Sequence, residues 1–175
     1  MVVVLGDHGR HEAAGVTEVE RQVGHFMTPL LIWLDQSVWP ESGYRPRTVS
    51  AIASQVDLAP TILSLNGFMP HVSPFVGRNL SCLLTTECQV ENRAFLSSVY
   101  DDLIGLVEND RLLLYSLRNE RLVESRLDLM ESTVRQPKDP AVAEQYRRLW
   151  ALYSATNALL ERNQLWSWAR LGGEL

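Results

Sequence analysis

Val2-Val3-Val4-Leu5-Gly6-Asp7-His8-Gly9 joins an apolar run directly to a polar turn that is flanked by glycines. A β-branched, uniformly apolar run is typical of a strand buried in a parallel sheet. Glycine and aspartate favour a turn after it. In open α/β sheets the reactive crevice lies at the carboxyl ends of the strands. We therefore expect Asp7 and His8 to point into one crevice at the end of a strand over 2–6.

Further elements are predicted in the first half of the chain. A second apolar segment, 30–34, predicts another buried strand. The polar stretch 8–28 predicts a long loop with a helical turn near Thr17–Val23, and long loops commonly carry function. Farther along, Asp57 is an expected N-cap for a helix over 58–66.

The second half predicts antiparallel strands followed by a long helix. The expected strands are 95–100, 103–108, 111–117 and 121–129. Asn109-Asp110 is a hairpin turn between two of them. Beyond Asp139-Pro140, apolar residues recur at intervals of three and four, which predicts a helix with one apolar stripe. The members of this stripe are Val142, Tyr146, Leu149, Trp150, Tyr153, Thr156 and Leu160.

Four separated motifs occur in a characteristic order. They are Leu5-Gly6-Asp7-His8-Gly9, Pro29-Leu30-Leu31-Ile32-Trp33, Gln55-Val56-Asp57-Leu58-Ala59-Pro60-Thr61-Ile62-Leu63 and Phe75-Val76-Gly77-Arg78-Asn79-Leu80. Their succession over roughly residues 2–130 resembles the C-terminal part of sulfatases and of phosphoglycerol and phosphoethanolamine transferases in the alkaline phosphatase superfamily. The lipoteichoic acid synthase-like enzymes look closest.

The resemblance implies a fold and a division of the chain. The expected fold class is α/β: the C-terminal portion of an alkaline phosphatase-like sandwich with a mainly parallel sheet, a small antiparallel sheet and a C-terminal helix. Residues 1–135 would form an incomplete catalytic domain, and residues 136–175 the helix and tail. In the family the nucleophile lies far upstream of the Asp-His-Gly turn. We therefore expect the chain alone to be inactive, and to need either the missing N-terminal half or a homo-oligomer.

The resemblance also implies a metal site. Asp7 and His8 would supply half the ligands of a divalent ion, Mn²⁺, Zn²⁺ or Ca²⁺, because a carboxylate and an imidazole suit such ions. The substrate would be a phosphate or sulfate ester, with a lipid head group as one candidate. In the family, anion-contacting residues lie in the loop after this turn, which makes His25, His11 and Arg10 the substrate-binding candidates. The alternative for these three is a solvated loop side chain.

Cys82 and Cys88 lie close together in sequence and allow two interpretations. They are either two buried thiols, since free cysteine behaves as a small hydrophobe, or a local disulfide. Disulfides persist outside the cytoplasm, where the family's catalytic domain usually resides. By resemblance the full-length parent would act at the extracytoplasmic face of the membrane. This piece itself should be soluble, since no apolar run approaches the ~20 residues that span a bilayer.

Composition and motifs narrow the function classes. The chain has 175 residues, 46% of them hydrophobic, which is typical of one globular domain. Its net charge of -5 and dispersed Lys and Arg argue against nucleic acid. A calcineurin-like metallophosphoesterase is excluded for two reasons. In that class one residue separates the Asp from the His, whereas Asp7 and His8 are adjacent, and this chain lacks the Asn-His and His-x-His motifs of the class. A metal-dependent hydrolase or transferase remains, with a non-catalytic structural or interaction module as the alternative.

Overall fold

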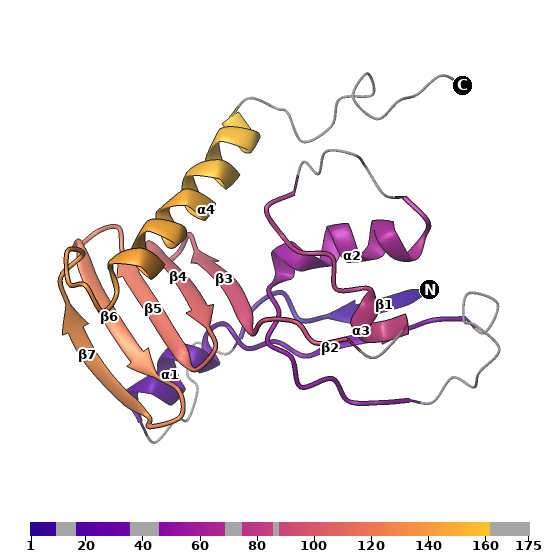
Figure 1. Cartoon of the computed structure of the whole chain (residues 1–175), viewed down its shortest axis with the longest axis horizontal. Coiled ribbons are helices and arrows are strands. Elements are labelled where there is room, and N and C mark those ends of the chain that lie inside the picture. The colour runs from indigo at the N-terminus through magenta and orange to yellow at the C-terminus, as the bar shows by residue number, and fades with distance from the viewer. Residues whose placement is uncertain (10–16, 36–45, 69–74, 86–87, 162–175) are drawn as a thin grey trace.

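The computed structural model describes residues 1–9, 17–35, 46–68, 75–85 and 88–161. In chain order the elements are β1 (Val2–Leu5), α1 (Glu18–Gly24), β2 (Leu30–Trp33), the 3-10 helix η2 (Gln55–Asp57), α2 (Leu58–Leu65), α3 (Cys82–Thr85), β3 (Arg93–Ser98), β4 (Leu103–Glu108), β5 (Arg111–Ser116), β6 (Arg121–Arg126), β7 (Glu131–Arg135) and α4 (Ala143–Glu161). Figure 1 shows α1 and α4 next to a five-stranded sheet, and α2 and α3 near a small ribbon of β1 and β2.

The five-stranded sheet is an antiparallel meander with the strand order β3-β4-β5-β6-β7. The predicted turn at Asn109-Asp110 joins β4 to β5 and is confirmed. Asn109 has a φ of 55°, a conformation that asparagine tolerates better than most residues. β7 is not among the strands expected from the sequence, because Glu131–Arg135 contains one apolar residue, Val134. It forms an exposed edge of the sheet, where polar side chains are favoured.

One face of this sheet is covered by α4, as the apolar stripe predicts. Val142 and Leu149 are fully buried against the sheet residues Ile104, Leu106 and Leu113. Other members of the stripe also pack on this core: Tyr146, Trp150 and Tyr153. The amide of Gln145 donates to the carbonyl of Leu106 at 3.0 Å, which satisfies a polar group at the helix–sheet contact.

The opposite face of the sheet is covered by α1 and the residues that follow it. Val23 and Phe26 pack against the sheet residues Val107 and Leu112. The predicted helical turn near Thr17–Val23 is confirmed as α1. Thr17 caps it reciprocally with Glu20: the amide of Glu20 donates to Thr17 Oγ1 at 3.1 Å and the amide of Thr17 to Glu20 Oε2 at 2.8 Å.

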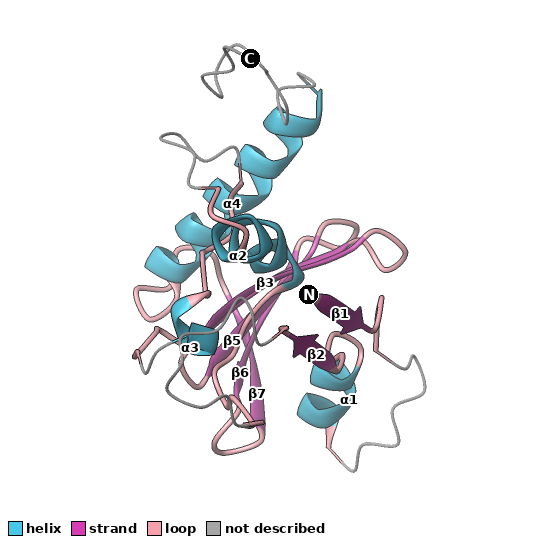
Figure 2. Cartoon of the chain, turned by 90° about the vertical axis from the view of Figure 1, so that its right-hand side faces the viewer, coloured by secondary structure: helices cyan, strands magenta, loops and turns pink. Residues whose placement is uncertain are grey.

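The expected mainly parallel sheet is wrong. β1 and β2 pair antiparallel, with Val2 opposite Trp33 and Leu5 opposite Leu30, and every strand pair among the described residues is antiparallel. Figure 2 shows this ribbon beside the five-stranded sheet rather than within it. A parallel return needs a crossover packed on the same sheet. α1 follows β1 in sequence but packs against β7, so β2 returns alongside β1 in the opposite direction.

The expected burial of these two strands is also wrong. Val4 is 56% exposed and Leu31, its register partner, 60%. An all-apolar run signals a strand that some surface must cover, but it specifies neither the direction of pairing nor the covering layer. Within the described residues, the ribbon therefore presents apolar side chains to solvent.

The predicted helix over 58–66 is confirmed as α2, but Asp57 has a different role from the one expected. Its carboxylate makes no capping bond to α2. Instead it accepts from Arg78, at 2.6 Å from the backbone amide and at 2.8 Å from Nη2. Gly77 permits this contact, because a Cβ there would lie 1.8 Å from the carbonyl oxygen of Val56. Two of the four motifs thus dock on each other as a scaffold.

Cys82 and Cys88 are joined by a disulfide with an S–S distance of 2.11 Å. The bridge closes a short loop that begins at α3. Among the described residues, no helix combines the length and the apolar composition needed to cross a membrane.

Candidate functional site

The Asp-His-Gly turn leaves the end of β1 and lies against the segment that leads into β2. The amide of Gly6 donates to the carbonyl of Pro29 at 3.2 Å, and the amide of Gly9 to the carbonyl of His25 at 2.9 Å. A Cβ on Gly9 would lie 1.9 Å from the carbonyl oxygen of Gly24. Glycine is therefore required at position 9 for this close approach.

Asp7 and His8 lie side by side on this turn. Asp7 Oδ2 is 3.6 Å from His8 Nε2, and the amide of His8 donates to Asp7 Oδ1 at 2.9 Å. His8 Nδ1 is 2.8 Å from the carbonyl oxygen of Gly9. Because a carbonyl only accepts, this contact assigns a proton to Nδ1 and leaves Nε2 as the nitrogen that faces the carboxylate.

The contact between Asp7 Oδ2 and His8 Nε2 is electrostatically favourable in two cases. A carboxylate oxygen and an unprotonated imidazole nitrogen are both acceptors, so their approach is favourable if the imidazole gains a second proton or if a cation lies between them. Both side chains are open to solvent, with exposures of 89% for Asp7 and 63% for His8. Within the described parts of the chain, no third His, Cys, Asp or Glu completes a metal-binding group with them.

His25 ends α1, and its ring lies near the turn between β3 and β4. Its Nδ1 is 3.6 Å from Asp101 Oδ2, and that oxygen also accepts from Ser98 Oγ at 2.6 Å. The side chain of His25 is 23% exposed. His25 and His8 line the same cavity, so the structure brings these two predicted site residues together. Arg10 and His11 lie outside the described residues.

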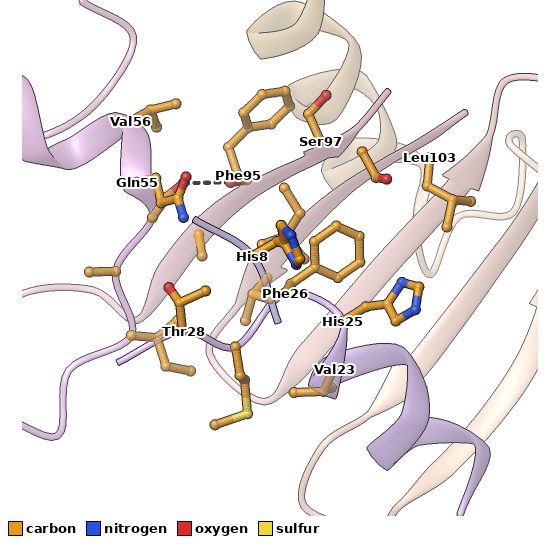
Figure 3. Close-up of a pocket in the computed structure, with 18 of the residues that line it drawn as sticks. His8, Val23, His25, Phe26, Thr28, Gln55, Val56, Phe95, Ser97 and Leu103 are labelled. Carbon is orange, nitrogen blue, oxygen red and sulfur yellow. Dashed lines mark hydrogen bonds between the residues drawn. The ribbon is translucent and has the colours of Figure 1, made fainter. Parts of the chain in front are cut away.

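This cavity has a volume of about 1290 Å³ and lies between the five-stranded sheet, α1 and the β1–β2 ribbon. Figure 3 shows His8 between Gln55 on one side and Phe26 and His25 on the other. Ser97, Ser98 and Asp101 add polar groups to the lining. Much of the remaining wall is apolar: Val23, Phe26, Ala94, Leu96, Val107 and Leu112.

Three residues near the candidate site were not expected from the sequence. Ser98 ends β3 and Asp101 lies in the turn that follows it, where both residue types are explained by turn formation alone. Gln55 donates to the carbonyls of Gly6 and Asp7. Gln55 belongs to the third motif, and this was the one indication in the sequence of a role for it. The residue singled out in that motif was Asp57, which binds Arg78 in the scaffold.

The family resemblance rests on these motifs alone. Comparison with protein-family models, with curated proteins and with solved structures found no match to this chain.

Proposed function

We propose that this chain supplies the Asp-His metal ligands of a sulfatase-like hydrolase or phosphoglycerol/phosphoethanolamine-type transferase acting on phosphate or sulfate esters. The observation that carries the proposal is the 3.6 Å separation of Asp7 Oδ2 and His8 Nε2, with Nδ1 engaged by the Gly9 carbonyl. Two ligand atoms about 2.1 Å from one tetrahedral ion lie about 3.4 Å apart. The two side chains thus need little rearrangement to bind the same ion.

The chemistry of the substrate explains why such a pair is useful. Phosphate and sulfate esters are anionic, and a bound Mn²⁺, Zn²⁺ or Ca²⁺ would neutralise their oxygens and lower the pKa of a nucleophile. Without a cation, the exposed carboxylate of Asp7 repels an anionic ester. His25, in the same cavity, is the candidate contact for the ester's anionic oxygens. The Cys82–Cys88 disulfide supports an extracytoplasmic setting, where such bonds persist.

Calorimetric titration with Mn²⁺ and Zn²⁺ tests this proposal. Wild-type chain should bind weakly, because two protein ligands leave the other positions to water. Asp7→Asn should weaken binding by at least about tenfold, since it removes one charged ligand. Asp128→Asn is the matched control, because Asp128 is a partly exposed aspartate paired with Arg126 on another turn. Tight binding that survives Asp7→Asn would refute the assignment of this ligand pair.

A second candidate function is a non-catalytic, sulfatase-like module that binds another protein. The exposed apolar side chains of β1 and β2 favour it, because such surfaces mark interaction sites. Under this alternative, Asp7→Asn would leave both the partner interaction and the fold unchanged.

A further inference from the structure

Gln55 contacts the backbone on both sides of the Cα of Asp7. Its Nε2 donates to the carbonyl of Gly6 at 3.1 Å and to the carbonyl of Asp7 at 2.9 Å. A side-chain amide carries two N–H donors, so one group can serve both carbonyls. These are the carbonyls of the two peptide units that flank the first candidate ligand.

The backbone that carries Gln55 is itself held against β3. Ser54 Oγ donates to the carbonyl of Phe95, and the amide of Ser54 donates to Asp57 Oδ2 at 3.0 Å. Arg78, which binds the same carboxylate, also donates from Nη1 to the carbonyl of Glu91 at 2.6 Å. Gln55 therefore connects the Asp-His-Gly turn to a hydrogen-bonded scaffold that is anchored on the five-stranded sheet.

The turn is held at its other end by a different partner. The amide of Gly9 donates to the carbonyl of His25, on the opposite side of His8 from Gln55 (Figure 3). From this two-sided support we infer that Gln55 is a positioning residue, which fixes the Asp7–His8 pair at the separation suited to one metal ion. This inference rests on the proposed function, in which Asp7 and His8 must lie at a separation that lets both bind one metal ion.

Gln55→Met tests this inference, because methionine keeps the length of the side chain and removes both N–H donors. Gln89→Met is the matched control, since Gln89 is another exposed glutamine, located between Cys88 and β3. Gln55 is exposed as well, so both variants should melt close to wild type, and the effect of Gln55→Met should be confined to the turn.

Two measurements follow on the full chain. In metal-free protein, amide hydrogen exchange at Gly9 should become about tenfold faster in Gln55→Met and stay unchanged in Gln89→Met. In a calorimetric titration with Mn²⁺, affinity should fall about ten- to a hundredfold in Gln55→Met, the usual effect of losing support behind a ligand.

The outcomes separate the inference from the proposed function. If Gly9 exchange accelerates but even wild type binds no Mn²⁺, the proposed function fails and the positioning of the turn stands. If Gly9 exchange is unchanged in Gln55→Met, or if wild type binds Mn²⁺ and Gln55→Met binds it equally well, Gln55 does not position the ligands and the inference is overturned. Equal effects from Gln89→Met would also overturn it, because the response would then be a general one to losing an exposed glutamine.

Discussion

At the scale of single residues, a backbone carbonyl contacts the ring of His8 and orients it. A metal-binding imidazole needs a partner on its second nitrogen to set the tautomer, and the carbonyl of Gly9 occupies that place at 2.8 Å. The position of Gly9 depends in turn on the carbonyl of His25. Three consecutive residues of the turn therefore provide the ligands and the group that orients one of them.

This arrangement predicts the tautomer of His8. At a pH where the imidazole is neutral, nitrogen NMR should find the proton on Nδ1 in the folded chain, because Gly9 accepts it. The chain unfolded in urea serves as the control, since the carbonyl is no longer held beside the ring and the two tautomers should mix. A folded chain that carries the proton on Nε2 would contradict the geometry.

At the scale of elements, α4 contributes to stability through the part of its predicted stripe that is buried on the sheet, whereas Leu160, the last predicted member, is not buried. Leu149 is fully buried against the sheet, whereas Leu160 on the same helix is 58% exposed. Leu149→Ala should lower the free energy of unfolding by about 2–5 kcal/mol, because it leaves a cavity in the core. Leu160→Ala should change it by less than about 0.5 kcal/mol. Urea denaturation of both variants measures the difference, and equal effects would mean that α4 does not pack on the sheet as described.

A second stabilising contact at this scale links three strands. Glu124 on β6 accepts from Arg111 on β5 and from Arg135 on β7, each at 2.7 Å from Nε. Burial by itself raises the pKa of this carboxyl, but the hydrogen bonds from both guanidinium groups outweigh burial and hold the pKa below its usual value. A lowered folded-state pKa adds stability above the ordinary carboxyl pKa, and this stability is lost as the pH falls through the folded value.

Glu124→Gln should therefore destabilise the sheet at neutral pH by about 1.5–3 kcal/mol, the range for hydrogen bonds to a charged group. The difference from wild type should shrink as the pH falls through the lowered folded-state pKa of Glu124. Urea denaturation across a pH series measures it, with Glu131→Gln, on the exposed start of β7, as the control. A difference that is the same at every pH would show that the charge of Glu124 is not what stabilises the strands.

At the scale of the whole molecule, the ribbon of β1 and β2 exposes apolar side chains to solvent. Leu31 is 60% exposed and Val4 is 56% exposed, and among the described strands β1 and β2 pair only with each other. Such surfaces favour pairing with another chain.

In the absence of another partner, the purified chain should therefore self-associate. Size-exclusion chromatography with light scattering should report species larger than a monomer, and Leu31→Lys should reduce their fraction by placing a charge on the ribbon. Val134→Lys on β7 is the control, because Val134 is comparably exposed at 55% but lies on the other sheet. A monodisperse wild-type monomer that melts cooperatively would contradict this prediction, because it would show that the chain folds without a second chain on the ribbon.

Local patterns in the sequence determined most of the elements. The apolar segments between residues 95 and 129, the Asn109-Asp110 turn and the stripe after Asp139-Pro140 predicted an antiparallel sheet and a long helix with one apolar face, as observed. The placement of Asp7 and His8 at the end of β1 was also predictable, since a turn directly follows an apolar run.

Only the tertiary structure decided how β1 and β2 pair, how far they are exposed and what holds the candidate ligands. A uniformly apolar strand has no preferred direction of pairing. In the structure β2 pairs antiparallel with β1, and α1, which lies between them in sequence, contacts β7. Likewise, Asp57 and Gln55 belong to one motif, yet one binds Arg78 in the scaffold and the other supports the Asp-His-Gly turn. These roles depend on partners that are 21 and 48 residues away in the chain, a distance over which local sequence carries no information about contact.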